Sequence, residues 1–279
     1  MLINEALRGR RVVVMSSGIR PDRHDDIGHA TVQAFAEAGA EVLAVHANED
    51  NARSSTEELR ALSLDVATHV VDPRTSTDLG QLYEQVARRW DSLDILVTSH
   101  FGTYFANGVQ TSAAQLEEVL RVNVTAPFLA TMTFLPLLEQ AAQPAVVHVS
   151  SIDGTYGNPN VPAYSISKGG TNVLIHVLAA ELAPRGVRVN GIGRAASTVM
   201  PIPDTAFVSL SDATPLVRAA DPAEYAGPIL FLASAEAAYI TGAVLPVDGG
   251  RTAITPGTSP AYGGYRSHLA TSAPAGQRS

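Results

Sequence analysis

Short, nearly continuous apolar runs alternate along this chain with longer segments in which apolar residues recur every three or four positions. The short runs are rich in β-branched residues and are bounded by polar or glycine-containing turns, which is typical of buried β-strands. They predict strands at Arg11–Met15, Glu41–His46, Val66–Val71, Ile95–Ser99, Ala145–Ser150, Val187–Ile192 and Ala243–Val247. The periodic segments predict helices at Ile27–Ala38, Ser55–Leu62, Thr77–Trp90, Ala113–Leu138, Ala163–Leu182 and Pro222–Leu232.

This alternation of strand and helix indicates the α/β class. Near-continuous apolar strands separated by amphipathic helices imply a parallel sheet that is covered by helices on both faces. Because crossovers between parallel strands are right-handed, the expected architecture is a doubly wound, Rossmann-like sheet in a single domain over residues 1–251. Ligands bind such sheets beyond the carboxyl ends of the strands, so the residues at those ends are the candidates for chemistry.

Composition narrows the classes of function. The chain has 279 residues, of which 46% are hydrophobic and 16% charged, as in a well-buried globular protein. Its net charge of −8 argues against nucleic acid or an anionic membrane as a partner. The absence of cysteine excludes disulfides and thiolate metal sites, and we expect no bound metal. The polar N-terminus lacks the apolar run of a signal peptide, and the apolar stretch Val122–Leu138 reads as a buried helix, so we expect a cytoplasmic protein.

One stretch concentrates groups suited to acid–base chemistry. The fifth predicted strand ends in Ser150-Ser151, Tyr164 follows thirteen residues after Ser151, and Lys168 follows four residues after Tyr164. On a helix Tyr164 and Lys168 lie one turn apart on the same face. Lys168 is also the only lysine among the 19 Lys and Arg residues. A compact ammonium and a planar guanidinium are not interchangeable, so a chain that otherwise uses arginine keeps a lysine where only lysine serves.

The loop after the first strand is a candidate phosphate-binding loop. Ser17 and Gly18 end the strand, and Ile27 and Gly28 open the following helix, where backbone N–H groups could reach a pyrophosphate. The residues between Gly18 and Asp26 are polar and contain no glycine, so an ordinary strand–helix connection is the alternative interpretation.

The end of the second strand bears on the choice of nucleotide. A carboxylate there would bind the 2′-hydroxyl of NAD, but this chain has His46. Arg20, Arg23 and Arg53 are near enough in sequence to serve a 2′-phosphate, which favours NADP(H). The alternative is that His46 merely ends the strand and faces solvent.

Taken together, these motifs resemble the short-chain dehydrogenase/reductase family from Gly9 to Gly250. Ser151, Tyr164 and Lys168 occur in the family's order, and Asn123 in Arg121-Val122-Asn123-Val124 occupies the place of its fourth catalytic residue. Val71-Asp72 follows the third strand, where the family has an aspartate that touches adenine. The segments Tyr239–Gly242 and Pro246–Gly250 match the end of the family pattern.

The resemblance implies an NAD(P)-dependent oxidoreductase that interconverts a secondary alcohol and a ketone. Tyr164 would be the general acid–base, Lys168 would favour its phenolate and hold the nicotinamide ribose, and Ser151 would hydrogen-bond the substrate oxygen. Asn123 would complete a proton path through a bound water. The implied cofactor contacts are Ser17, Gly18, Ile27, Gly28, His46, Asp72, Ser99, Tyr164, Lys168 and Ser197. The family also implies a homo-oligomer, either a tetramer or a dimer.

Three cofactor segments depart from the family pattern. The phosphate loop is four residues longer, with Asp26 at the place of its middle glycine. The fourth strand ends in Thr98-Ser99-His100-Phe101-Gly102, where the family has Asn-Asn-Ala-Gly, and Arg194-Ala195 stands where the family has Pro-Gly. These changes keep two further hypotheses open, namely a non-redox elimination or isomerisation that uses the Tyr164–Lys168 pair, and a binding subunit without turnover.

The segment at about residues 195–221 corresponds to the family's substrate lid. Its apolar residues, together with five around the site, suggest a mainly apolar small molecule as substrate. These five are Phe101, Tyr104, Phe105, Ile152 and Tyr156, and about half of them are as well explained as core residues. Residues 252–279 form a tail rich in Gly, Pro, Ser and Ala, which either lacks order or wraps a neighbouring subunit.

Overall fold

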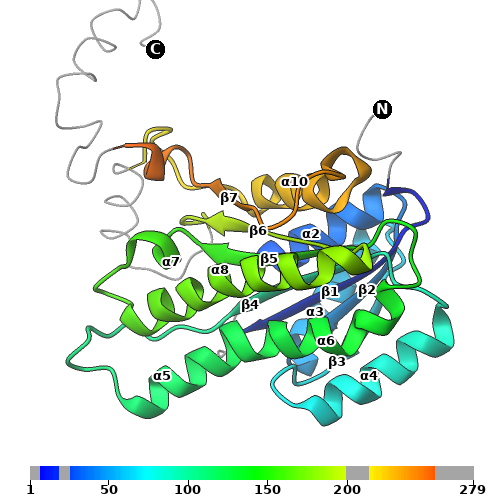
Figure 1. Ribbon diagram of the computed structural model, residues 1–279, viewed down its shortest axis with the longest axis horizontal. Coiled ribbons are helices and arrows are strands. Elements are labelled where there is room, and N and C mark those ends of the chain that lie inside the picture. Colours follow the sequence, from blue (N-terminus) through cyan, green and yellow to red (C-terminus); the bar gives the residue numbers. More distant parts are fainter. Residues whose placement is uncertain (1–6, 19–25, 199–213, 255–279) are drawn as a thin grey trace, which may run out of the picture.

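A computed structural model describes residues 7–18, 26–198 and 214–254 of the protein. Its centre is one parallel sheet with the strand order β3-β2-β1-β4-β5-β6-β7 (Figure 1). The strands are β1 (Arg11–Gly18), β2 (Glu41–His46), β3 (Ala67–Val70), β4 (Ile95–Phe101), β5 (Ala145–Ser151), β6 (Arg188–Arg194) and β7 (Val244–Val247). The order reverses at β1, as expected for a doubly wound sheet.

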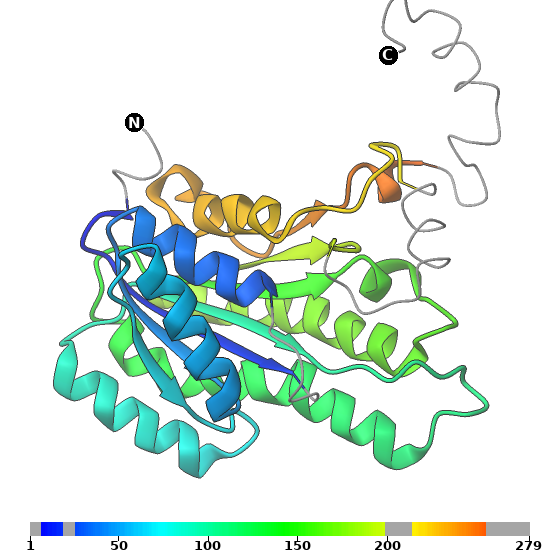
Figure 2. The same ribbon diagram turned by 180° about the vertical axis from the view of Figure 1, so that it is seen from behind.

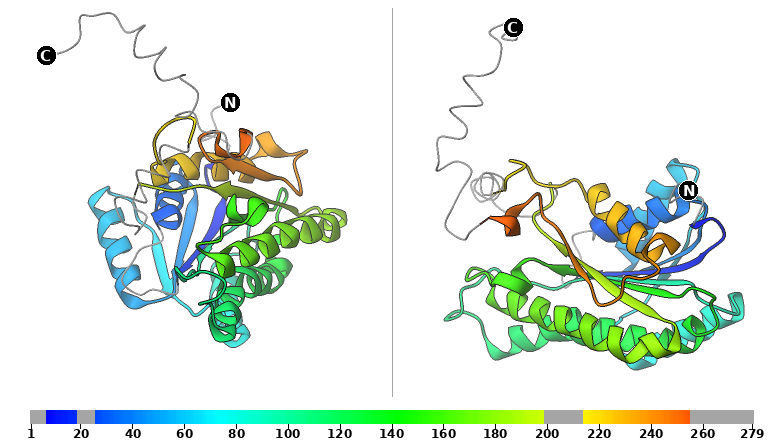
Figure 3. Two further views of the ribbon diagram at one scale, coloured as in Figure 1. Left: turned by 90° about the vertical axis from the view of Figure 1, so that its left-hand side faces the viewer. Right: turned by 45° about the horizontal axis from the view of Figure 1, so that its top comes forward.

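Helices cover both faces of the sheet (Figures 2 and 3). On one face α2 (Asp26–Glu37), α3 (Glu49–Ala61) and α10 (Pro222–Ala233) pack a cluster built around Phe35 and Ile229. On the other face α4 (Ser76–Arg89), α6 (Ala126–Leu138) and α8 (Pro162–Leu182) pack a second cluster built around Phe134 and Leu178. The strands bury apolar side chains in both clusters, which explains why their sequences lack polar alternation.

The predicted elements are confirmed in type and order, with most of their ends within three residues of the predicted ones, and three larger differences occur. The helix α3 begins six residues earlier than Ser55, because the Asn48 side chain caps it by accepting a hydrogen bond from the Asn51 N–H. A short helix, α7 (Asp153–Tyr156), occupies a stretch for which the sequence predicted no element. The long helix Ala113–Leu138 is divided by a π-helical turn. Polar first turns and single-turn helices carry no apolar period, so the pattern did not show them.

That divided helix is also the one described helix long and apolar enough, by length and composition alone, to cross a membrane. Its parts are α5 (Ala113–Leu120), the π-helical turn Arg121–Thr125 and α6. Ala130, Phe134 and Leu138 of α6 are fully buried in the second core cluster. These three apolar side chains therefore pack against the sheet, whereas Phe128 of the same helix is exposed.

The carboxyl edge of the sheet opens between β4 and β5. The β1–β4 ladder runs on to the pair Gly18–Phe101, and the β5–β6 ladder runs on to the pair Ser151–Arg194. The β4–β5 ladder, by contrast, ends at Thr98–His148. The last three residues of each strand therefore diverge, which leaves main-chain carbonyls of both strands facing a gap.

Candidate active site

The helix α8 places Tyr164 and Lys168 over this gap. Both residues lie in its first two turns, one turn apart, and the helix starts with Pro162 at its first position, where a missing N–H costs nothing. The short helix α7 packs closely on the same turns, because Gly154 has no side chain and a Cβ there would overlap the Lys168 main chain. Gly154 therefore fixes how near α8 can approach the end of β5.

Lys168 bridges the two diverging strands. Its Nζ donates hydrogen bonds to the Val149 carbonyl of β5 at 2.7 Å and to the His100 carbonyl of β4 at 2.9 Å. The side chain is 2% exposed, so the ammonium is held in a setting where these carbonyls replace water. A single point charge that can donate in several directions suits this position.

Tyr164 and Ser151 lie beside this ammonium. The Lys168 Nζ is 5.8 Å from the centre of the Tyr164 ring, and the Phe101 ring meets the Tyr164 ring edge-on at a centroid distance of 5.4 Å. Ser151 is the last residue of β5, where its hydroxyl donates to the Arg194 carbonyl at 3.3 Å and accepts from the Asp153 N–H at 3.1 Å. The hydroxyl, phenol and ammonium expected from the sequence thus gather at one strand end.

Asn123 lies in the π-helical turn and acts on the loop after β4. Its side-chain oxygen accepts from the Gly102 N–H, and its amide nitrogen donates to the Gly102 carbonyl and to the Ser167 hydroxyl, each at 2.8 Å. Its own carbonyl accepts from Thr171 at 2.9 Å. π-Helical turns of this kind often mark functional sites. Asn123 therefore ties the loop after β4 to α8, and its role in a proton path through water stays a prediction.

Two histidines are buried beneath Lys168. His148 of β5 and His100 of β4 are 0% and 3% exposed, and the His148 Nδ1 is 2.7 Å from the Thr98 hydroxyl. Burial, followed by the charge of Lys168, lowers the pKa of each ring to about 3, and His148 contributes further to the shift of His100. Both rings are therefore neutral at physiological pH, which keeps additional positive charge away from the ammonium.

We expect these histidines to make the fold sensitive to acid. Between pH 6.5 and about 3 these histidines are protonated in the unfolded chain but neutral in the folded protein. The free energy of unfolding therefore rises with pH through this window and falls on acidification. Each ring contributes up to about 1.4 kcal/mol per pH unit. The measurement is the free energy of unfolding by urea at several values between about pH 6 and pH 4.

Replacing one of the two histidines measures its contribution to the pH dependence of the free energy of unfolding. His148→Asn removes the titration and keeps a group that can hydrogen-bond Thr98, so the variant should lose stability less steeply with acid than the wild type. His176→Asn, on the exposed side of α8, is the matched control and should follow the wild type. Equal slopes for His148→Asn and the wild type would contradict the assignment.

The candidate phosphate loop lies only partly within the described residues. Ser17 and Gly18 end β1, α2 begins at Asp26 directly opposite, and Gly28 is buried in its first turn. Ile27 is 2% exposed and belongs to the core, so its side chain contributes packing. Arg20 and Arg23 lie outside the described residues. The first helix after β1 presents its N-terminal N–H groups to the switch point, as a dinucleotide requires.

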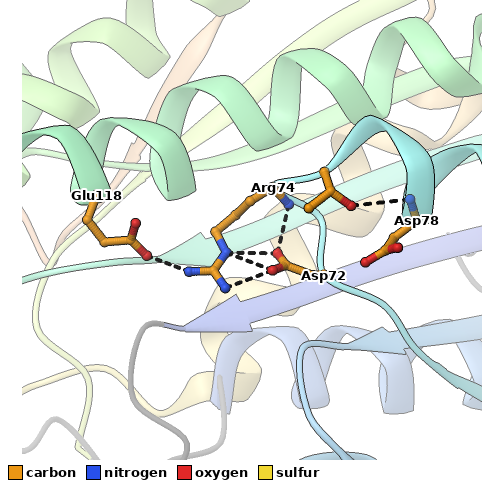
Figure 4. A network of polar contacts seen from close by, with 5 residues as sticks. Asp72, Arg74, Asp78 and Glu118 are labelled. Carbon is orange, nitrogen blue, oxygen red and sulfur yellow. Dashed lines mark hydrogen bonds and ion pairs between the residues drawn. The ribbon is translucent and has the colours of Figure 1, made fainter.

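At the end of β2, His46 is 4% exposed, so the alternative that it faces solvent is wrong. Beside it, the Asp72 carboxylate accepts three side-chain hydrogen bonds from Arg74, which also reaches Glu118 of α5 (Figure 4). These hydrogen bonds hold the pKa of Asp72 below its usual value. Arg53 pairs with Asp50 in the exposed part of α3. Asp72 is therefore fixed in place as a hydrogen-bond acceptor, although Arg74 already occupies much of its capacity to accept hydrogen bonds.

The remaining expected contacts, Ser99 and Ser197, are 2% and 3% exposed at the ends of β4 and β6. Just after β4, the hydroxyl oxygen of Thr103 is buried and has no hydrogen-bond partner among the described residues. Buried hydroxyls normally have a partner, so this one points to a polar ligand at the same edge. Together with the N-terminus of α2 and the Lys168 ammonium, it makes the edge suited to a dinucleotide.

Sequence reasoning missed the environment of Arg194. Its guanidinium lies 5.2 Å from the centre of the Phe101 ring. Tyr225 of α10 is nearby, since burial raises the pKa of Tyr225 while the charge of Arg194 opposes the shift, and Tyr164 acts on it as well. A cavity of about 180 Å³ begins at the next residue, Ala195, and continues between α10 and β7. The substitution of the Pro-Gly pair was the only signal in the sequence.

Comparisons with known proteins show which family the chain resembles. The profile of the family described as enoyl-(acyl carrier protein) reductase matches residues 23–252. The 3-oxoacyl-(acyl-carrier-protein) reductase of Thermotoga maritima is 33% identical over 80% of this chain and 92% of its own length. Galactitol 2-dehydrogenase of Cereibacter sphaeroides is 34% identical over 81% of this chain and 91% of its own length. A solved structure described as a short-chain dehydrogenase/reductase from Burkholderia xenovorans has a TM-score of 0.82 at 30% identity, over 90% of this chain and 99% of that one.

Proposed function

This chain belongs to the short-chain dehydrogenase/reductase family, and from that membership we propose how its own residues divide the work. It is an NAD(P)-dependent oxidoreductase that acts on alcohol and carbonyl groups. The observation that supports the assignment of residues is the Lys168 ammonium, held between β4 and β5 beside Tyr164 and Ser151.

In this proposal Tyr164 exchanges a proton with the substrate oxygen, and Ser151 hydrogen-bonds the same oxygen and orients it. Lys168 stabilises the phenolate by its charge and holds the nicotinamide ribose. Asn123 holds the loop after β4 against α8 through its hydrogen bonds to Gly102 and Ser167. The nicotinamide, when bound, supplies hydride transfer. Ser17, Gly18, Gly28, Asp72, Ser99 and Ser197 are the proposed residues around the nucleotide, and Ile27 supports them from the core.

We propose NADP(H) as the preferred cofactor, because His46 ends β2 where a carboxylate would select NAD(H). Titration of NADPH and NADH against the purified protein, followed by fluorescence, should give a dissociation constant at least about tenfold lower for NADPH, since a 2′-phosphate adds charge-assisted contacts. His46→Asp should reverse the order by repelling the phosphate. Tighter binding of NADH to the wild type would contradict the preference. Binding of neither nucleotide would instead favour elimination or isomerisation by the same Tyr164–Lys168 pair.

The proposed substrate is a small molecule with a mainly apolar body. Phe101 and Tyr104 are partly exposed beside the site, and Phe105 and Tyr156 are 50% and 60% exposed. Ile152 is 8% exposed and belongs with the buried residues. Of the proposed lid at about residues 195–221, the stretch 199–213 lies outside the described residues. Exposed aromatic side chains at the mouth of a site commonly line the substrate pocket.

We further propose that the enzyme is cytoplasmic and works as a homo-oligomer. Ile166, Val173 and Val177 form an exposed apolar stripe along α8, and each is more than 50% exposed. Phe128 of the neighbouring α6 is also exposed. An apolar stripe on adjacent helices is typical of a contact between subunits. A sedimentation measurement of the molar mass in solution tests this proposal, and a monomer would contradict it.

A further inference from the structure

Arg194 brings an additional positive charge to the rim of the site. It is the last residue of β6 and lies opposite Ser151 in the β5–β6 ladder. Its carbonyl accepts a hydrogen bond from the Ser151 hydroxyl. Its side chain is only 8% exposed. Its guanidinium covers Phe101, whose ring in turn meets Tyr164. The cation therefore lies one aromatic ring away from the proposed acid–base.

The charge of Arg194 has no anionic partner among the described residues. Its side chain makes a single hydrogen bond there, from Nε to the Ala195 carbonyl at 3.1 Å, although a guanidinium has five N–H donors. Both carboxylates that line the adjoining cavity are engaged elsewhere. Glu224 accepts from Arg218 at 2.6 Å, and Asp248 accepts from the N–H groups of Gly250 and Thr252.

Two other poorly exposed arginines have polar partners within the fold. Arg188 donates to three main-chain carbonyls, those of Leu232, Ser234 and Ile240. Arg10 pairs with Asp94 at 3.0 Å. A charge withdrawn from water without such partners is costly. The incomplete set around Arg194 thus fits a ligand that brings its own anionic group.

We propose that Arg194 binds a carboxylate of the substrate, so that the preferred substrates are oxo acids and hydroxy acids with an apolar body. The planar guanidinium matches the two oxygens of a carboxylate. The inference rests on the proposed function, because it places the reacting carbonyl at Ser151 and Tyr164. From there a carboxylate a few bonds away reaches Arg194, the neighbour of Ser151 on the adjacent strand.

A nucleotide phosphate is the other anion to consider. The expected pyrophosphate position is the N-terminus of α2, the first helix after β1. Between β1 and β6 lie β4 and β5, and three strand spacings amount to at least roughly 14 Å. The 2′-phosphate position at the end of β2 is one strand further away. The topology therefore assigns Arg194 to the substrate side of the site.

The test uses phenyl ketones that carry a carboxylate at increasing distance from the carbonyl. The probes are benzoylformate, 3-benzoylpropionate and 4-benzoylbutyrate, each compared with its methyl ester. For wild type, Arg194→Met and Arg194→Lys, kcat/KM is measured with the preferred nucleotide. The wild type should prefer at least one acid over its ester by about 10- to 100-fold. Arg194→Met should remove most of this preference, and Arg194→Lys should keep part of it.

The controls separate this inference from the proposed function. Arg185→Met removes an exposed arginine that pairs with Glu139, and it should keep the wild-type ratio of acid to ester. Calorimetry with 4-phenylbutyrate and 4-phenylbutyramide repeats the comparison without turnover. If no ketone is reduced, the proposed function fails on these probes and the calorimetric comparison alone decides about Arg194.

Two results would overturn the inference. One is a ratio of acid to ester, or of acid to amide in binding, that is the same in wild type and Arg194→Met. The other is a dissociation constant for the nucleotide that weakens about tenfold in Arg194→Met while that ratio stays constant, which would assign Arg194 to a phosphate. Urea unfolding checks each variant, and Arg194→Gln replaces Arg194→Met if the latter does not fold.

Discussion

Tyr164→Phe is expected to abolish turnover and to leave the fold intact. The ring is 5% exposed and packs against Phe101, so the phenyl group keeps these contacts and only the ionisable oxygen is lost. Positioned acid–base groups contribute about 10²- to 10⁴-fold to rate, and kcat should fall by a factor in that range. Steady-state kinetics with an excess of nucleotide and substrate measures the effect.

The control for this substitution is Tyr239→Phe, which removes the same oxygen from a fully exposed side chain and should be silent. Nucleotide affinity should change little in Tyr164→Phe, which separates a loss of chemistry from a loss of binding. A rate within about tenfold of the wild type, equivalent to ~1.4 kcal/mol in the barrier, would remove Tyr164 as the acid–base.

Lys168→Arg is expected to be nearly as damaging to turnover as Lys168→Ala, with losses of at least about a hundredfold for both. The ammonium donates to carbonyls of two different strands at 2.7 and 2.9 Å in a gap that excludes solvent. A guanidinium is larger and planar, so it would push β4 and β5 apart or leave the gap. In either case the positive charge moves away from Tyr164.

Stability measurements distinguish the two substitutions. Lys168→Ala leaves two buried carbonyls without their donor, at about 1 to 3 kcal/mol each in free energy of unfolding. Lys168→Arg can still donate to one or both carbonyls and should lose less stability than Lys168→Ala, although its turnover is similarly low. Wild-type turnover in Lys168→Arg with an unshifted pH–rate profile would mean that the single lysine is an accident of composition.

Two of the three altered cofactor segments, at the ends of β4 and β6, contact each other in the structure. Phe101, which extends β4 beside Gly18, stands between the Arg194 guanidinium and the Tyr164 ring. The changes at the ends of β4 and β6 therefore form one connected group. They alter the lining of the site and leave Ser151, Tyr164 and Lys168 in place.

The order of strands and helices could be predicted from the amino-acid sequence, because the strands of a parallel sheet buried on both faces are continuous apolar runs. It also determined the identity and spacing of Ser151, Tyr164 and Lys168, because a helical turn brings residues four apart to one face. The solitary lysine also led to the prediction that arginine cannot replace it at position 168. These features depend on local geometry, which a linear pattern records directly.

The surroundings of these residues could not be predicted and become visible only in the folded structure. The divergence of β4 from β5, the two carbonyls that hold Lys168 and the burial of His100 and His148 all arise between segments far apart in the chain. The same holds for Arg194, because its cation–π contact with Phe101 and the lack of a carboxylate partner among the described residues depend on which elements meet at the edge. Hydrogen bonding and desolvation act across space and leave no period in the sequence, so the electrostatic character of the site appears only once the sheet is assembled.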